Sequence, residues 1–87
     1  MDYTKKIYYY IDLLNGRKNA IIRRLIGDGS SKKYFEELKS INECFAYLVE
    51  NGFIEQIDNF DEMQFDQRQA SLNDGDSIYK RTNKKFE

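Results

Sequence analysis

The sequence predicts a single α+β domain in which three helices are followed by a small antiparallel β-hairpin or wing. Apolar residues recur at helical spacing in three successive segments, and this spacing is lost after Asn51-Gly52. The 87 residues have the length of one small domain, and no repeat or proline-rich segment divides them. We therefore expect one domain over residues 1–87, with 59–76 as a mobile acidic loop and 83–87 as a tail.

The longest helix is predicted in the stretch 34–54, where apolar side chains recur every three or four positions. Its outer face carries Glu36, Glu43 and Glu50 at seven-residue spacing. Gly52 is expected to end the helix, because glycine readily adopts the left-handed backbone found after a last helical turn. The residues expected on the buried face are Phe35, Leu38, Ile41, Phe45, Leu48 and Val49.

A first helix is predicted over residues 2–14 or 4–14. The residues expected on its buried side are Tyr3, Ile7, Tyr10, Ile11 and Leu14. Tyr9 and Leu13 form a second apolar face, with Tyr8 on its flank. This face could pack within the chain, form a homodimer interface or bind a partner, since tyrosine combines a large apolar area with a polar tip.

A second helix is predicted over residues 17–26, with apolar side chains inward and arginines on the outside. The glycine-containing stretch 27–31 follows, and its serines offer an N-cap for the long helix. Lys32 and Lys33 are then expected to open the long helix, where the helix dipole favours acids instead.

Beyond Gly52 the sequence predicts short strands. Residues 53–57 read as one strand. The Asp74-Gly75 pair indicates a two-residue hairpin turn, flanked by strands over 63–72 and 77–82.

The composition argues against catalysis and against a bound metal or cofactor. The chain has no histidine, the usual general base and a common metal ligand, and Cys44 is its only cysteine. The acids between Asp58 and Asp76 do not have the spacing of a calcium loop. The chain shows neither a signal peptide nor an apolar run long enough for a membrane helix, so we expect a cytoplasmic, non-enzymatic protein.

Charge is distributed unevenly along the chain. Residues 1–40 contain nine Lys/Arg and five Asp/Glu. Residues 41–76 contain one Lys/Arg and nine Asp/Glu, and residues 77–87 contain four Lys/Arg and one Asp/Glu. Such a chain can present a basic surface and an acidic surface. Alternatively, the blocks interleave in space and neutralise each other.

Two segments resemble winged-helix transcription regulators. Residues 47–55, YLVENGFIE, are similar to the end of the third helix and the start of the wing, and residues 78–84, IYKRTNK, to the returning wing strand. The resemblance implies a DNA-binding regulator whose third helix enters the major groove. The acidic outer face of the long helix departs from this pattern, because it would repel phosphates.

We therefore expect any DNA contacts to come from the basic segments and to be directed mainly at phosphates. The candidate residues are Arg17, Lys18, Arg23, Arg24, Lys32, Lys33, Lys80, Arg81, Lys84 and Lys85.

The alternative hypothesis is a protein-binding inhibitor or adaptor, of the kind that phages and mobile elements encode. Its acidic surface would imitate the charge of a nucleic acid and bind a basic protein partner. The candidate residues for this role are Asp58, Asp61, Glu62, Asp66, Tyr9 and Leu13.

Overall fold

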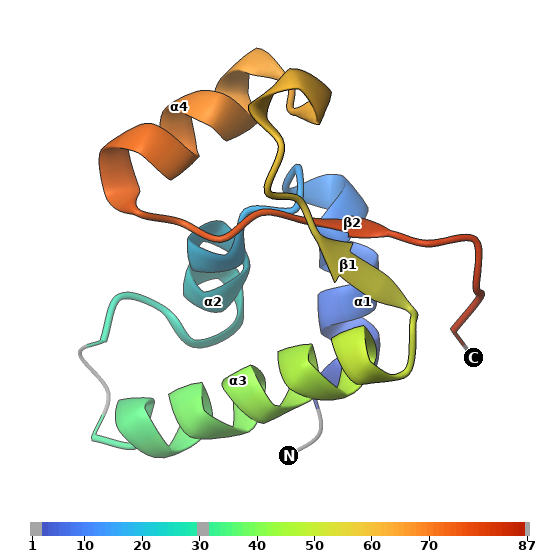
Figure 1. The fold of residues 1–87 in the computed structure, drawn as a ribbon. Coiled ribbons are helices and arrows are strands. Elements are labelled where there is room, and N and C mark those ends of the chain that lie inside the picture. Colours follow the sequence, from blue (N-terminus) through green and yellow to red (C-terminus); the bar gives the residue numbers. More distant parts are fainter. Residues whose placement is uncertain (1–2, 30–31, 87) are drawn as a thin grey trace.

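The computed structural model describes residues 3–29 and 32–86, with the side chains of Ala70, Asn73 and Asp74 left out. Within this part of the chain, three helices precede a strand, a short helical segment, a further helix and a second strand (Figure 1). The elements are α1 (Thr4–Leu13), α2 (Lys18–Ile26), α3 (Tyr34–Glu50), β1 (Ile54–Gln56), the 3-10 helix η1 (Phe60–Glu62), α4 (Phe65–Asp74) and β2 (Tyr79–Arg81).

The two strands form an antiparallel sheet in which Ile54 pairs with Arg81 and Gln56 with Tyr79. On its other side, the β2 segment meets the turn between α1 and α2 through an isolated bridge between Arg17 and Ile78. The predicted class, helices followed by a small antiparallel strand pair in a winged-helix-like arrangement, is therefore confirmed.

Gly16 permits the close approach of the α1–α2 turn to β2. Its φ is +72°, and a Cβ at this position would lie 1.8 Å from the carbonyl oxygen of Tyr79. The backbone N–H of Tyr79 donates to the Gly16 carbonyl at 2.9 Å. Only glycine fits this backbone contact.

The core lies where α1, α2 and the strand pair meet one side of α3. Its most deeply buried side chains are Ile7, Ile21, Ile41, Phe45, Leu48, Ile54 and Ile78. The predicted buried face of α3 was too wide, because Phe35 is 80% exposed and Val49 is 40% exposed. Both lie next to the covered stripe rather than within it.

The beginning of α3 differs from the prediction. Lys32 and Lys33 precede the helix instead of forming its first turn, and Lys33 occupies the N-cap position without a capping side-chain bond. Ser30 and Ser31, the residues of the predicted serine cap, lie outside the described residues. Glu36 and Glu37 occupy the first turn, where their charge suits the helix dipole.

Tyr8 belongs to the core rather than to an outer apolar face. It is 7% exposed, its ring lies 5.5 Å from that of Phe86, and its hydroxyl donates to the carbonyl of Lys84 at 3.3 Å. Phe86 also contacts Phe53, with 5.0 Å between the ring centroids. The segment predicted as a tail therefore packs on α1 through Phe86.

The predicted strand over 63–72 and its hairpin are wrong, because this stretch contains α4. A capping box between Gln64 and Gln67 starts the helix, and Gly75, with φ +62°, ends it. The Asp74-Gly75 pair is thus a helix end, and the predicted acidic loop 59–76 contains η1 and α4.

None of the helices within residues 3–29 and 32–86 has the length and hydrophobicity needed to span a lipid bilayer.

Candidate functional site

The ten candidate cations fall into two groups in space. Figure 1 shows the α2–α3 connection and the C-terminal segment on opposite sides of the molecule, so the fold does not unite the cations beside that connection with those of the C-terminal segment. The first group, around α2, is Arg17, Lys18, Arg23, Arg24, Lys32 and Lys33, and the second, on and after β2, is Lys80, Arg81, Lys84 and Lys85.

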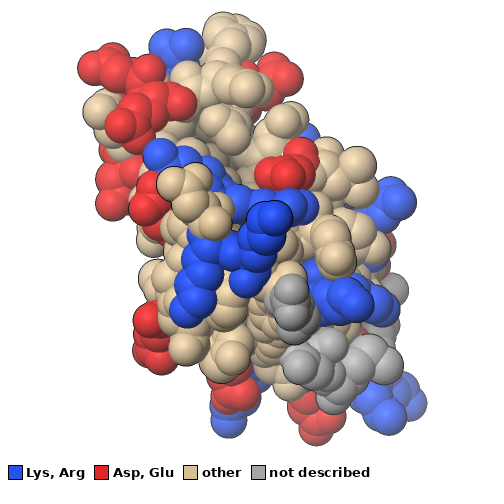
Figure 2. All heavy atoms as spheres, turned by 90° about the vertical axis from the view of Figure 1, so that its right-hand side faces the viewer, with Lys and Arg blue, Asp and Glu red and all other residues tan. Residues whose placement is uncertain are grey.

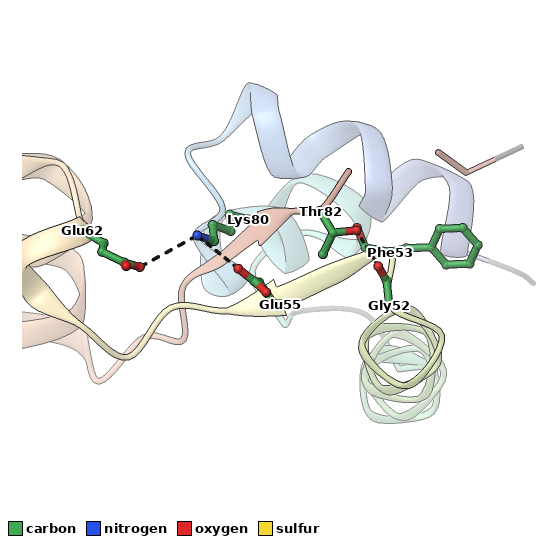
Figure 3. Close-up of polar contacts among 6 residues, drawn as sticks. All are labelled: Gly52, Phe53, Glu55, Glu62, Lys80 and Thr82. Carbon is green, nitrogen blue, oxygen red and sulfur yellow. Dashed lines mark hydrogen bonds and ion pairs between the residues drawn. The ribbon is translucent and has the colours of Figure 1, made fainter. Parts of the chain in front are cut away.

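Lys80 is paired with acids of its own chain (Figure 3). The antiparallel register places Lys80 opposite Glu55, and its Nζ lies 3.1 Å from Glu55 Oε1 and 3.8 Å from Glu62 Oε2. The hydrogen bond and charge of Glu55, with a smaller contribution from Glu62, raise the pKa of Lys80. Acidic and basic blocks of the sequence therefore neutralise each other at this point.

Arg81 fastens β2 to the second half of α1. Its Nε donates to the carbonyl of Tyr8 at 3.1 Å, and its Nη2 lies 3.4 Å from the carbonyl of Tyr9 and 3.2 Å from Asp12 Oδ2. The guanidinium also lies 4.4 Å from the ring centroid of Tyr8. These contacts use the planar fork of arginine within the fold.

Thr82 and Lys84 fasten the following segment to the end of α3. The Thr82 hydroxyl donates to the carbonyl of Gly52, and its oxygen lies 3.1 Å from the Phe53 carbonyl oxygen (Figure 3). Lys84 Nζ donates to the carbonyl of Asn51 at 2.8 Å and lies 4.5 Å from the Phe53 ring centroid. Lys84 therefore interacts favourably with the negative end of the α3 dipole.

The side of the molecule that carries β2 and the C-terminal segment is nevertheless basic. Figure 2 shows Lys and Arg side chains gathered across the middle of this side, with acids mainly around its margin, at the upper left and along the bottom. Lys85 is exposed there, whereas the charged ends of Lys80, Arg81 and Lys84 contact their own chain. The charged ends of these three residues are therefore already engaged by other residues of the chain.

Arg17 and Lys18 are only partly exposed. Arg17 precedes α2, and its Nε is buried without a hydrogen-bond partner among the described residues. Lys18 Nζ lies 5.2 Å from the ring centroid of Phe45. Burial lowers the pKa of Lys18, and the charge of Asp76 opposes this shift.

The remaining cations form what we call the α2–α3 corner: Arg23 and Arg24 in the last turn of α2, and Lys32 and Lys33 immediately before α3. All four are exposed. Arg23, Arg24 and Lys32 form no ion pair with another described residue. The corner borders an open hollow of ≈ 480 Å³, which is lined by Asn19, Ile22, Arg23, Asp28, Tyr34 and Leu38.

The candidate residues of the alternative hypothesis lie elsewhere. On α1, Tyr9 is 53% exposed and Leu13 is 63% exposed, whereas Tyr8 is buried. The predicted second apolar face of this helix therefore consists of two exposed residues instead of three. The acids Asp58, Asp61, Glu62 and Asp66 are all exposed on the chain from β1 to the start of α4. Glu62 is held near Lys80.

The outer face of α4 carries two exposed apolar residues that were not among the predicted site residues. Phe65 is 66% exposed and Leu72 is 65% exposed, and their seven-residue separation places them on one side of the helix. That spacing was visible in the sequence, but a strand prediction assigned the two residues to opposite faces.

No protein-family model, curated protein or solved structure matches the chain. Among the described residues, His, Cys, Asp and Glu side chains form no group of three that could hold a metal ion.

Proposed function

We propose that the protein is a small, non-catalytic, winged-helix-like nucleic-acid-binding regulator that contacts phosphates through the α2–α3 corner. The observation that carries the proposal is the excess of exposed positive charge there. Residues 17–33 contain six cations and a single acid, Asp28, and the four cations of the corner are exposed.

The geometry of the corner suits phosphate binding. No described side chain caps the first backbone N–H groups of α3, and Lys32 and Lys33 immediately precede the helix. Exposed lysines attract phosphates, whereas Glu36 and Glu37 in the first turn oppose an anion at the helix N-terminus itself. The cations of the corner can therefore contact a nucleic-acid backbone beside the beginning of α3.

The proposed contact reads little sequence. Glu36, Glu43 and Glu50 are exposed along α3, and their carboxylates would be repelled by phosphates if the helix lay deep in a groove. Contacts from the corner to phosphates hold a duplex in register without distinguishing its bases. We expect weak sequence preference and strong dependence on salt.

Binding of a fluorescently labelled duplex as a function of salt tests the proposal. Four phosphate contacts give a slope of log Kobs against log salt of about −3.6, or an affinity loss of roughly a hundredfold between about 50 and 200 mM salt. Arg23→Gln with Arg24→Gln should reduce the slope to about half that value.

Lys80→Gln is the matched control, because it removes one positive charge that is already paired with Glu55. It should leave the salt slope nearly unchanged. Absence of binding at about 50 mM salt, or a slope near zero, would refute the proposed function.

A further inference from the structure

Helix α4 turns its large apolar side chains outward, whereas a helix that packs on a core usually buries them. Phe65 and Leu72 are exposed, and among the α4 side chains that the structure describes Gln67 and Ser71 are partly buried. Isolated exposed apolar residues are common, but two large ones on the same face form an apolar surface that another molecule can cover.

Polar contacts hold α4 in this orientation. Gln67 Nε2 donates to the carbonyl of Asn15 in the α1–α2 turn at 2.6 Å, and Gln67 Oε1 accepts from the backbone N–H of Gln64 at 3.0 Å. Just before the helix, Met63 is buried in a small cluster with Ile57 and Ile78. The inner side of α4 is thus anchored while its apolar side faces outward.

The gap beneath α4 does not offer Phe65 and Leu72 a place to turn inward. A cavity of ≈ 180 Å³ lies between α4, α1 and β2, and Asp12, Asn15, Gln64, Gln67, Lys80 and Arg81 are among its lining residues. Burying two large apolar side chains there would desolvate charged and amide groups. Their apolar surface is available only to another molecule.

The charge around α4 identifies the chemistry of that molecule. Residues 57–76 contain six acids and one cation, Arg68. Two copies that met through their α4 faces would bring like charges together, which disfavours a homodimer at this site. A partner with apolar side chains flanked by lysines or arginines complements both the exposed face and the acids beside it.

We propose that the outer face of α4 docks a basic amphipathic helix of a partner protein. The apolar residues of that helix rest on Phe65 and Leu72, and its cations face Asp61 and Asp66 near the start of α4. This is the helix-docking mode in which residues at i, i+3, i+4 and i+7 supply the anchors.

The test is affinity selection of displayed random peptides of about 15 residues, roughly four helical turns, on the immobilised full chain. Enriched peptides should carry a net positive charge and apolar residues at helical spacing. A synthetic copy should bind more weakly as salt is raised. Phe65→Ser with Leu72→Ser should weaken its binding at least tenfold.

The matched control is Phe35→Ser with Leu13→Ser, which removes two equally exposed apolar residues from α3 and α1. It should leave peptide binding unchanged. Enrichment of acidic or nonhelical peptides, or equal losses in the two double variants, would overturn the proposal. The proposal would also be overturned if the wild-type protein sedimented as a dimer and Phe65→Ser with Leu72→Ser sedimented as a monomer. The partner on the α4 face would then be a second copy of the chain.

Duplex binding separates this proposal from the proposed function. The α2–α3 corner shares no residue with the α4 face, so Phe65→Ser with Leu72→Ser should retain the wild-type salt slope on DNA. Either proposal can therefore fail without affecting the other.

Discussion

Replacing Arg81 by alanine should destabilise the fold by about 2–3 kcal/mol. The guanidinium donates to two carbonyls of α1, at 3.1 and 3.4 Å, and its side chain is only 26% exposed. A hydrogen bond from a charged donor contributes about 1.5–3 kcal/mol, and the longer one contributes less. Asp12 is 66% exposed, so its ion pair with Arg81 adds about 0–1 kcal/mol.

For a domain of this size, such a loss corresponds to a fall in melting temperature of about 10–20 °C. Thermal denaturation followed by circular dichroism measures it. Arg81→Lys should lose most of the same stability, because an ammonium group cannot reproduce the two directed bonds. Lys85→Ala, at an exposed position nearby, should stay within about 0.5 kcal/mol of wild type.

The experiment decides between two roles for Arg81. If Arg81 bound phosphate, Arg81→Ala would lower the affinity for a duplex and leave the melting temperature unchanged. That result would refute the structural role inferred from the contacts with Tyr8 and Tyr9.

Three further predictions concern the fold around the strand pair. Gly16→Ala should cost about 3 kcal/mol or more in urea denaturation, because its Cβ would lie 1.8 Å from the carbonyl oxygen of Tyr79; a variant as stable as wild type would contradict this backbone contact. Phe86→Ala should cost about 1–2 kcal/mol through lost aromatic contacts, and an unchanged melting temperature would mean that the segment does not pack on α1. Burial lowers the pKa of Lys18, so the folded state binds this proton less tightly than the unfolded chain does. Lys18→Met, which keeps an apolar stem over Phe45, should therefore raise the melting temperature at neutral pH. The gain should shrink as pH rises through the lowered pKa and disappear above 10.5, and a gain that grows with pH would contradict the argument.

The helical part of the fold was predictable because its signals are local. The periodicity of α1, α2 and α3 and the Asn51-Gly52 stop place the three helices within a few residues of their observed bounds. Tyr8 was misplaced because the residues that cover it, Phe53 and Phe86, are distant in sequence. Helical spacing cannot report such partners.

The α4 segment was misassigned for a different reason. Asp74-Gly75 is equally compatible with a hairpin turn and with a helix end, since both use the left-handed backbone at glycine. The capping signal of Gln64 and Gln67 favoured the helix, but the stretch has too few apolar residues to show a clear period.

The ten cations of the candidate site were visible as residue types, but their roles were not. Lys80 and Arg81 look like ligands for phosphate until the register of β2 places them beside Glu55 and α1. The exposure of Arg23 and Arg24 depends likewise on how α2 packs, which only the folded chain defines.

The position of β2 between two partners that are distant in sequence has a kinetic consequence. Its contacts with Gly16 and Ile54 close long loops, and such contacts slow folding. We expect the helices to gather first and β2 to join after the main barrier, so that substitutions in β2 chiefly accelerate unfolding. During synthesis on the ribosome, the apolar surface that Ile78 and Tyr79 cover in the folded protein would stay exposed on the helices until these two residues emerge.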